Sequence, residues 1–301
     1  MELPPEADPC PSVRRAPSAE KLRVSLKYME EIIFLNGEFI SQKEAKLSVL
    51  SPAFLCGWGL FETMRAYHNK IVYFDAHLAR IKHSSRLIGL RLPYPQEKLK
   101  GIIRKAVKKS GFQDAYIRLT LWKEDLGMGI SVIVRKHKPY PPQKYKSGIN
   151  LTFSPFRQSE NSFFARIKTS NRLLYKLSYL EAKKKGFSGS IILNNRGYIT
   201  EESRSNIFFV KDNALFTPFL SCGCLAGITR KVICDLAKIY NIKVYEGNFT
   251  PQDLYAAEEV FLTNSLIGVM PAASIGHQTI GKGKCGRLTK FFIEKYHSLL
   301  K

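Results

Sequence analysis

The run Lys138-Pro139-Tyr140-Pro141-Pro142-Gln143 constrains the fold more than any other segment of this chain. Proline fixes φ and lacks a backbone N–H, so three prolines in four positions exclude a helix interior or a central strand. The chain has 301 residues, 45% of them hydrophobic, which exceeds one typical domain and can bury a sizeable core. We therefore expect a domain at 29–138, a linker at 139–147 and a larger domain at 148–301.

The segment before the linker has the pattern of a small α/β domain. Apolar residues on both sides of Asn36-Gly37 predict a hairpin, because this dipeptide favours a tight two-residue turn. A second hairpin should turn at His68-Asn69-Lys70, and Asp75 is expected to be the N-cap of the helix that follows. The expected elements are strands at 32–35, 38–40, 60–67, 71–74, 115–122 and 130–134 and helices at 75–89 and 96–109.

The segment after the linker predicts a mainly antiparallel sheet with helices. Few clean βαβ units are evident, so the fold class expected for the whole chain is α+β, in two domains. The expected elements are strands at 149–153, 191–193, 198–200, 206–210, 242–245 and 260–263 and helices at 173–186, from 228 onward and at 287–299. The buried stripe of the helix from 228 should be Val232, Ile233, Leu236 and Tyr240.

The formal charge of +22 attracts polyanions of any kind. The basic residues nevertheless form short dispersed clusters, and no helix-turn-helix, zinc finger or aromatic RNA-binding signature accompanies them. We interpret the charge as a solvated surface on an enzyme that binds anionic ligands, and expect no nucleic-acid partner. A basic nucleic-acid-associated protein without enzymatic activity is the remote alternative.

Residues 1–28 differ in composition from the rest of the chain. They are rich in proline and charge and have no apolar core of a secretory signal, so we expect a disordered arm. The six cysteines show neither disulfide nor zinc spacing, and Cys222-Gly223-Cys224 is interpreted as two small residues in a loop. No apolar run has the length that crosses a bilayer. We expect a soluble cytoplasmic protein with no metal site.

Three motifs together offer an amine nucleophile, a carboxylate and an anion site. Lys168 follows Phe163-Phe164 and precedes a polar loop, where partial burial would lower its pKa and favour the neutral amine. Glu201 and Glu202 are adjacent on extended backbone, so one of them can enter a site. Gly227-Ile228-Thr229 begins an amphipathic helix whose N-terminal amides can bind an anion. Pyridoxal phosphate requires these three groups for its aldehyde, ring nitrogen and phosphate.

Each motif also has a simpler structural interpretation. Any single lysine is more often a solvated surface charge, and paired glutamates are usually on the surface. Thr229 could serve only to cap its helix. Arg80 could be an ordinary surface arginine, or it could bind the same phosphate bidentately. The motifs gain weight from occurring together.

In this order the motifs resemble the class IV, or fold type IV, pyridoxal-phosphate enzymes, which include branched-chain and D-amino-acid aminotransferases and aminodeoxychorismate lyase. The resemblance extends from Ile32 to the C-terminus and implies a homodimer. It implies that Lys168 is the catalytic Schiff-base lysine and that Glu201 holds the pyridine nitrogen. The residues implied for the phosphate are Arg80 of His77-Leu78-Ala79-Arg80, Ile228, Thr229 and Ser265.

The resemblance divides between two branches of the family. Lys168-Thr169-Ser170-Asn171-Arg172-Leu173 is most similar to the lyase branch, whereas Tyr116-Ile117-Arg118 is similar to branched-chain aminotransferases. The first expectation is a 4-amino-4-deoxychorismate lyase of folate biosynthesis, which forms 4-aminobenzoate and pyruvate. Its substrate carries two carboxylates, for which Arg118 and Arg65 are the candidate anchors. The alternative is a branched-chain or D-amino-acid aminotransferase that transfers an amino group to a 2-oxo acid.

Overall fold

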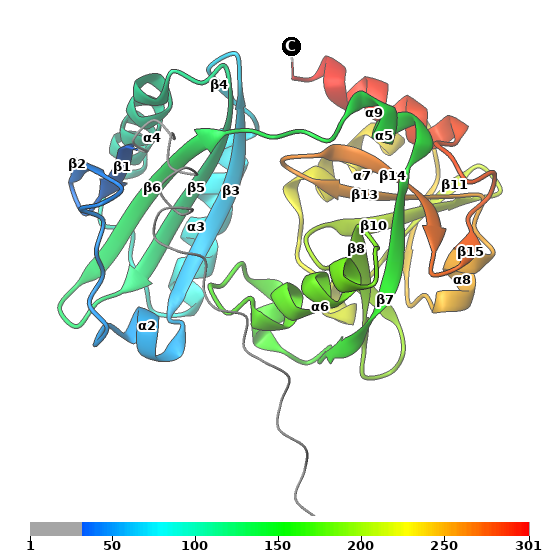
Figure 1. Cartoon of the computed structure of the whole chain (residues 1–301), viewed down its shortest axis with the longest axis horizontal. Helices are drawn as coiled ribbons and strands as arrows, with labels where there is room; N and C mark the ends of the chain where they lie inside the picture. The colour runs from blue at the N-terminus through cyan, green and yellow to red at the C-terminus, as the bar shows by residue number, and fades with distance from the viewer. Residues whose placement is uncertain (1–31, 301) are drawn as a thin grey trace, which may run out of the picture.

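The computed structural model describes residues 32–300, so the arm expected at 1–28 lies outside the described residues. Two β-sheets lie side by side, one built from the first half of the chain and one from the second, and the extended segment after β6 crosses between them at the top of the view (Figure 1). No helix within the described residues is both long and apolar enough to pass through a membrane.

The first sheet has six strands, and every neighbouring pair is antiparallel. In its central strand β5, alternate positions are buried, because successive side chains of a strand point to opposite faces. Helices α3 and α4 cover the apolar face (Figure 1) and pack Leu78 and Ile103 against it. The strand order is β2 (Glu38–Ser41), β1 (Ile32–Leu35), β6 (Met128–Lys136), β5 (Asp114–Lys123), β3 (Gly59–Tyr67) and β4 (Lys70–Ile71), with α2 (Pro52–Cys56), α3 (Phe74–Leu87) and α4 (Gln96–Ser110).

The start of α3 differs from the prediction. The strand expected at 71–74 ends at Ile71, and the helix begins at Phe74. The N-cap is Tyr73, held at φ 50°, rather than Asp75. Asp75 lies in the first turn instead, where its charge favours the helix dipole, and it forms an ion pair with Lys100 at 2.7 Å. The prediction that Asp75 lies near the start of this helix is confirmed, but the prediction that it is the N-cap is wrong.

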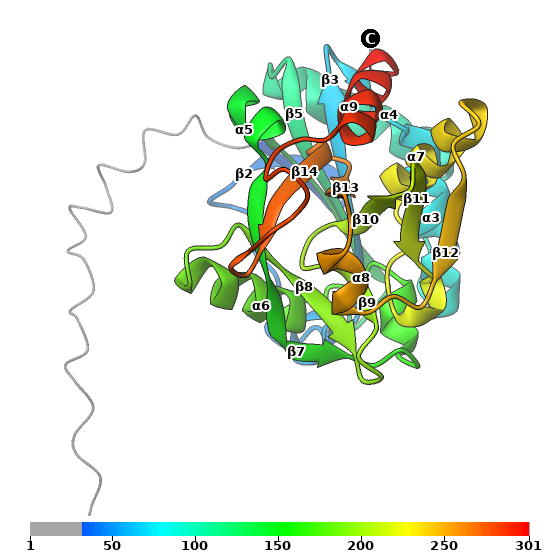
Figure 2. The ribbon, with the colours of Figure 1, turned by 90° about the vertical axis from the view of Figure 1, so that its right-hand side faces the viewer.

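The second sheet has nine strands and is mixed. Its pairs β11·β12, β14·β7 and β7·β8 are parallel, and the other pairs are antiparallel. Helix α6 (Leu173–Lys184) packs against β7 and β8, and α7 (Ile228–Ile239) and α9 (Arg287–Ser298) cover the opposite part of the sheet (Figure 2). The order is β12 (Val244–Gly247), β11 (Ala214–Pro218), β10 (Asn206–Lys211), β13 (Glu259–Asn264), β14 (Gly268–Ile275), β7 (Ile149–Gln158), β8 (Gly189–Asn194) and β9 (Ile199–Glu202), with β15 (Gln278–Thr279) beside β14.

The helices of this half are α5 (Pro142–Ser147), α6 (Leu173–Lys184), α7 (Ile228–Ile239), α8 (Pro251–Tyr255) and α9 (Arg287–Ser298), with short 3-10 turns at Phe163–Arg166 and Leu220–Cys222. Ile233 and Leu236 of α7 are buried as predicted, Val232 is only partly buried, and Tyr240, just after the helix end at Ile239, is 43% exposed. Strands β11 and β14 and the short helices α2, α5 and α8 were not predicted.

We propose that the two sheets with their helices are the cores of two domains, joined at 139–147. Most members of each apolar cluster come from one half of the chain, although Val72 packs in a cluster of the second half and Ile167 in the cluster of the first. Chain order keeps β1 to β6 in one sheet and β7 to β15 in the other. The connection is not a plain linker, since α5 occupies its second part. Pro142 is compatible with this helix because proline is tolerated in a first turn.

Candidate active site

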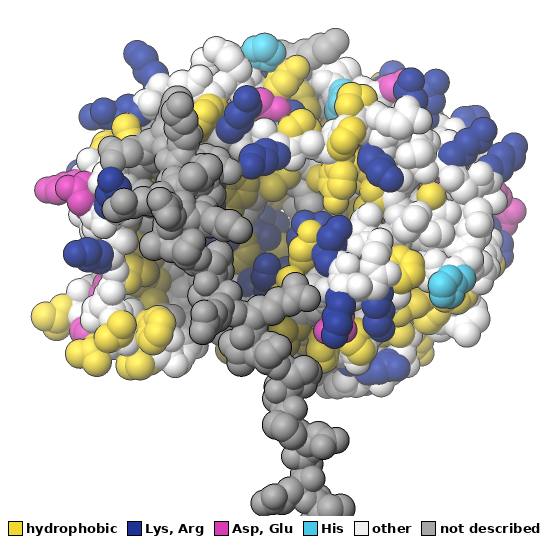
Figure 3. Space-filling model, viewed as in Figure 1, with side chains coloured by type: hydrophobic (Ala, Val, Ile, Leu, Met, Phe, Trp, Pro, Cys, Tyr) yellow, Lys and Arg dark blue, Asp and Glu magenta, His cyan; other side chains and the backbone are white. Residues whose placement is uncertain are grey.

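A cavity of about 1150 Å³ lies between the two halves and is lined by both. Lysine and arginine side chains are visible in this hollow in Figure 3. Of the eight residues predicted for the site, all but Arg65 line the cavity: Arg80, Arg118, Lys168, Glu201, Ile228, Thr229 and Ser265. Residues separated by up to 185 positions therefore meet at one site.

The segment that carries Lys168 pairs with the first sheet although it belongs to the second half of the chain. The Phe61 amide donates to the Lys168 carbonyl and the Ser170 amide to the Gly59 carbonyl, both at 2.9 Å. Leu60 and Thr169 form an antiparallel bridge between these bonds. The segment 168–170 thus extends the edge of β3, and the lysine backbone is fixed by both halves.

The Lys168 amine lies 4.7 Å from the centre of the Phe61 ring. Burial, and then the positive charge of Arg80, lower the pKa of this amine to about 7. A substantial neutral fraction therefore exists near pH 7, and the neutral amine is the nucleophilic form.

Glu201 is buried in β9 and incompletely hydrogen-bonded. Its Oε2 atom accepts from the Asn206 amide group at 3.3 Å and from the Leu225 amide at 3.4 Å. Among residues 32–300 its Oε1 atom has no hydrogen-bond partner, and burial raises the pKa of the carboxyl. Glu202 differs, because the Ser203 hydroxyl and the Arg204 amide donate to its two oxygens. Of these two glutamates, Glu201 is the one with an oxygen available for a cationic N–H group.

The N-terminus of α7 forms an uncapped anion site. Its N-cap residue, Gly227, provides no side-chain cap, and Gly227, Ile228 and Thr229 all line the cavity. The Thr229 hydroxyl is buried and has no partner within the described part of the chain. Free N–H groups at a helix start, together with a hydroxyl, suit a phosphate.

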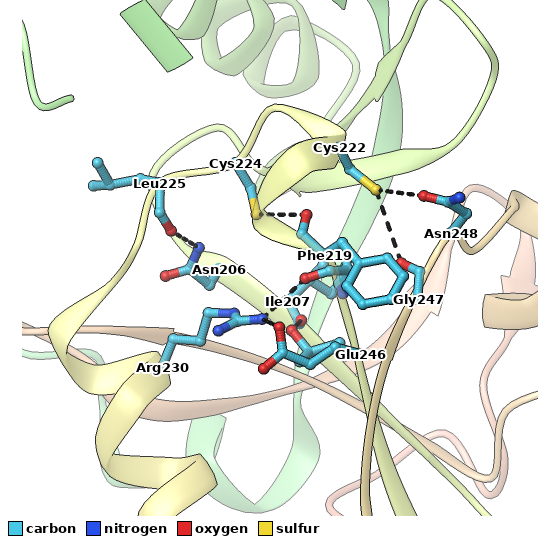
Figure 4. Close-up of polar contacts among 12 residues, drawn as sticks. Asn206, Ile207, Phe219, Cys222, Cys224, Leu225, Arg230, Glu246, Gly247 and Asn248 are labelled. Atoms are coloured by element: carbon cyan, nitrogen blue, oxygen red, sulfur yellow. Dashed lines mark hydrogen bonds and ion pairs between the residues drawn. The ribbon is translucent and has the colours of Figure 1, made fainter. Parts of the chain in front are cut away.

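Asn206 connects the carboxylate to this anion site. Besides contacting Glu201, its amide group donates to the Leu225 carbonyl at 2.8 Å (Figure 4). A Cβ atom on Gly227 would lie 1.9 Å from the Asn206 Oδ1 atom, so position 227 must remain glycine for this packing.

The turn before α7 is held by thiols and by an ion pair between a buried arginine and an exposed glutamate (Figure 4). Cys222 donates to the Asn248 side-chain oxygen at 3.1 Å, and Cys224 donates to the Phe219 carbonyl at 3.5 Å. From the first turn of α7, Arg230 binds Glu246 at 2.7 Å. Cys222 therefore ends a short 3-10 turn and Cys224 lies in the loop that follows it, so the sequence interpretation of two loop residues holds for Cys224.

Arg80 lines the cavity, as predicted, and is held there by partners that the sequence did not indicate. Its Nε and NH2 groups donate to the two oxygens of Glu62, both at 2.7 Å, and NH1 donates to the Ala226 carbonyl at 2.9 Å. Glu62 occupies the edge of the guanidinium formed by Nε and NH2, so the expected bidentate phosphate contact stays a prediction that would have to use NH1 and NH2. One N–H on each terminal nitrogen remains for an anion. His77 bridges Glu62 at 2.7 Å and the Ser265 hydroxyl at 3.3 Å.

The two arginines predicted as substrate anchors have different environments. Arg118 stacks on Phe61, with its Cζ atom 3.9 Å from the ring centre, and so lies beside the same ring as Lys168. Arg65 is bound bidentately by Asp114, at 2.8 and 2.6 Å, and lines no part of the cavity. Arg65 is therefore unsuitable as an anchor; it joins β3 to β5.

Sequence reasoning assigned no role to several residues of this cavity. The Arg172 Cζ atom lies 3.4 Å from the Tyr175 ring centre, and burial raises the pKa of Tyr175. Residues three apart at the start of a helix are neighbours on its surface, so the sequence alone could have predicted the contact between Arg172 and Tyr175. Glu62 and Asn206 gave no such signal, because their partners are distant in sequence.

These observations fit pyridoxal phosphate. The unpartnered Glu201 oxygen can receive a protonated ring nitrogen, and the uncapped start of α7 can receive the phosphate. The amine of Lys168 can react with the aldehyde. Fold and site together define a pyridoxal-phosphate-dependent enzyme of fold type IV.

The chain belongs to the class IV aminotransferase family, which matches residues 59–275. It is similar to the branched-chain-amino-acid aminotransferase of Escherichia coli K12, with 30% identity over 295 residues, covering 89% of this chain and 93% of that protein. The solved Escherichia coli branched-chain amino acid aminotransferase is 27% identical, covers 91% of this chain and 95% of its own, and superimposes with a TM-score of 0.86. A further solved branched-chain amino acid aminotransferase, with pyridoxamine 5'-phosphate, is 28% identical, with the same coverage and TM-score.

A Legionella pneumophila structure provisionally named a 4-amino-4-deoxychorismate lyase also matches, with 20% identity, coverage of 86% and 97%, and a TM-score of 0.79. Similarity at this identity supports the fold alone. The comparisons therefore favour the aminotransferase alternative over the lyase that was the first expectation. A nucleic-acid-associated protein without enzymatic activity is not supported.

Proposed function

We propose that the chain is an amino-acid aminotransferase and that branched-chain amino acids are among its amino donors. The observation that carries the proposal is that the Lys168 amine and the unpartnered Glu201 oxygen belong to one cavity, with the α7 N-terminus in the same wall. The choice of donor is supported by the names of the Escherichia coli relative and of the two solved aminotransferases.

Pyridoxal phosphate, when bound, supplies an electron sink for negative charge at the substrate α-carbon. Lys168 would act as the general base and acid that takes a proton from the substrate α-carbon and gives it up again. Glu201 keeps the ring nitrogen protonated. Arg118 binds the substrate α-carboxylate, and Arg80, Thr229 and Ser265, with the Ile228 amide, hold the phosphate.

An apolar surface beside the site supports a homodimer. Leu50, Phe54 and Leu55 are 67%, 71% and 66% exposed, and Leu173 is 70% exposed. Gly57, at the end of α2, lies against Asn171, just before α6. The exposed side chains near α2 and the exposed Leu173 therefore belong to one surface. We propose that a second copy of the chain covers this surface. Light scattering of the purified protein should give twice the chain mass, and Phe54→Asp should lower it.

The second candidate is the lyase, which the order of residues from Lys168 to Leu173 supports. One experiment separates the two functions. The enzyme is incubated with a branched-chain amino acid and 2-oxoglutarate in one tube and with aminodeoxychorismate in another. We expect glutamate in the first tube; fluorescent 4-aminobenzoate in the second tube alone would overturn the aminotransferase proposal.

A further inference from the structure

We propose that His77 is a positioning residue of the anion site. When a dianion binds beside Ser265, His77 takes up one proton, and the Ser265 hydroxyl turns toward the anion. The inference rests on the proposed function only in taking this end of the cavity as the phosphate site. It adds a proton, bound at His77, to the groups that hold the phosphate.

His77 is buried behind the cavity wall and connects the two halves of the chain. It lies in α3, its side chain is 1% exposed, and it does not itself line the cavity. Its Nδ1 atom is 2.7 Å from the Glu62 Oε2 atom in β3, and its Nε2 atom is 3.3 Å from the Ser265 Oγ atom. Ser265, between β13 and β14, does line the cavity. A ligand beside Ser265 is therefore one hydroxyl group away from His77.

Glu62 determines which ring nitrogen of His77 carries the hydrogen. Although burial opposes the charged form of Glu62, Arg80 and His77 lower its pKa to about 2, so the carboxylate is ionised at neutral pH and only accepts hydrogen bonds. The Nδ1 atom must then carry a hydrogen, which it donates to Glu62. In the neutral ring the Nε2 atom has a lone pair and accepts from the Ser265 hydroxyl.

This arrangement leaves Ser265 without a donor for the cavity, because a hydroxyl has a single hydrogen. Only oxygen lone pairs would face a bound anion, and they would repel it. Thr229 differs, since its hydroxyl has no partner within residues 32–300 and can donate to an anion directly. Protonation of His77 removes the conflict for Ser265. A proton from the solvent forms an N–H bond at Nε2, this group donates to the Ser265 oxygen, and the hydroxyl hydrogen is released to the anion.

The charges that face His77 make its protonation depend on the anion. Burial lowers the pKa of His77, the Glu62 carboxylate opposes this effect, and Arg80 and Lys168 add to it. The turn at 264–267 that carries Ser265 contains no charged residue. Without a further negative charge, His77 is therefore neutral at pH 7. A dianion beside Ser265 supplies that charge, and an opposite charge within about 4 to 6 Å favours the protonated ring.

The first test measures proton uptake with sulfate, which remains a dianion at neutral pH and takes up no proton itself. Isothermal titration calorimetry of the apoprotein at pH 7.5, in two buffers of different ionisation enthalpy, gives the number of protons bound with sulfate. The protein carries Lys168→Ala, because the Lys168 amine has a pKa of about 7 and would also titrate. We expect uptake of about one proton, and almost none when His77→Gln is added, since an amide does not titrate.

His83→Gln, added to the same Lys168→Ala protein, is the matched control. His83 is an exposed histidine of the same helix, so its loss should leave the proton uptake unchanged. Equal uptake with and without His77 would overturn the inference, as would uptake close to zero with His77 present.

A second measurement uses the wild-type protein and so does not depend on the folding of a variant. Nitrogen-15 spectra of histidine-labelled protein distinguish a neutral ring from an imidazolium, and His77→Gln serves only to assign the signal. At pH 7.5 we expect an imidazolium with the cofactor bound, and without it a neutral ring with its hydrogen on Nδ1. A neutral ring in both states would overturn the inference. Absence of amino transfer, with proton uptake intact, would instead reject the proposed function and leave the role of His77 standing.

Discussion

The Arg80 guanidinium donates to both carboxylate oxygens of Glu62, with N–O distances of 2.7 Å. This ion pair joins α3 to β3. Arg80 also donates to the Ala226 carbonyl, just before α7, so it links both elements to the start of that helix. Only 1% of the Glu62 side chain is exposed, so its charge depends on these partners rather than on water.

Replacing Glu62 by Gln should strongly destabilise the protein at neutral pH. The change leaves Arg80 and His77 without their acid, and removal of one partner of a buried pair costs about 3 to 5 kcal/mol. The free energy of unfolding, measured with urea at pH 7, should fall by that amount. A loss below about 1 kcal/mol would show that the pair contributes no more than a surface ion pair does.

The same pair should make stability depend on acid pH. Burial opposes the charged form of Glu62, but the charges and hydrogen bonds of Arg80 and His77 outweigh it and lower the pKa from 4.5 to about 2. A carboxyl with a lowered folded-state pKa stabilises the protein above its unfolded value, and loses this effect as pH falls through the folded value. The stability gap between wild type and Glu62→Gln should therefore narrow from pH 4.5 toward 2. A constant gap over this range would contradict the assignment.

The rate of cofactor uptake by the apoprotein should rise with pH and level off above about 8. The Lys168 pKa is lowered to about 7, so the neutral amine accumulates through that region and not near 10.5. The measurement is the appearance of visible absorbance after pyridoxal phosphate is added. Lys168→Ala should develop no such absorbance, and a normal spectrum in that variant would reject the role of Lys168. A rate that keeps rising to about pH 10 would reject the lowered pKa.

The sequence was sufficient for the features that depend on neighbouring residues. The hairpin at Asn36-Gly37, the helices α4, α6 and α9 and the start of α7 follow from turn residues and apolar spacing, and the structure has them. The order of motifs also predicted seven residues that meet in one cavity.

Features that depend on distant contacts could not be predicted. The edge of Arg80 formed by Nε and NH2 is taken by Glu62, 18 positions away, and Arg65 is taken by Asp114, 49 positions away. Strand β14 was missed because its burial comes from β13 and β7 on either side, and not from a pattern of its own. Which acid pairs with a given arginine depends on the tertiary fold, because the two partners are distant in the sequence.

Substitution of two glycines should have opposite effects. In Gly227→Ala the new Cβ would lie 1.9 Å from the Asn206 Oδ1 atom, so the Asn206 contacts with Leu225 and Glu201 must break. We expect cofactor affinity, measured by fluorescence titration, to fall about tenfold or more, because helix-start amides move away from the phosphate. Gly101→Ala in α4 meets no atom within 4 Å, and should raise the free energy of unfolding by about 0.5 to 1 kcal/mol. Unchanged cofactor affinity in Gly227→Ala would contradict the role of Asn206.

The thiols should differ in reactivity by location. Cys56 is exposed, whereas Cys222 and Cys224 are each 2% exposed, and burial raises the pKa of both buried thiols. Because the thiolate is the reactive form, iodoacetamide should modify Cys56 in native protein and spare the buried pair. Peptide mass spectrometry gives the extent at each site, and unfolding in urea should make Cys222 and Cys224 reactive. Rapid native labelling of Cys224 would be inconsistent with its hydrogen bond to the Phe219 carbonyl.

The pairing of residues 168–170 with β3 has a consequence for the order of folding. Strands β1 to β6 are all present once residue 136 has left the ribosome, so the first sheet can form before the second half is made. The edge of β3 at Leu60 then stays unpaired until Thr169 has been synthesised and pairs with it. The nucleophile is thus brought to the cofactor cavity by the same step that closes this edge, and newly made chains acquire the ability to hold the cofactor only when both halves have docked.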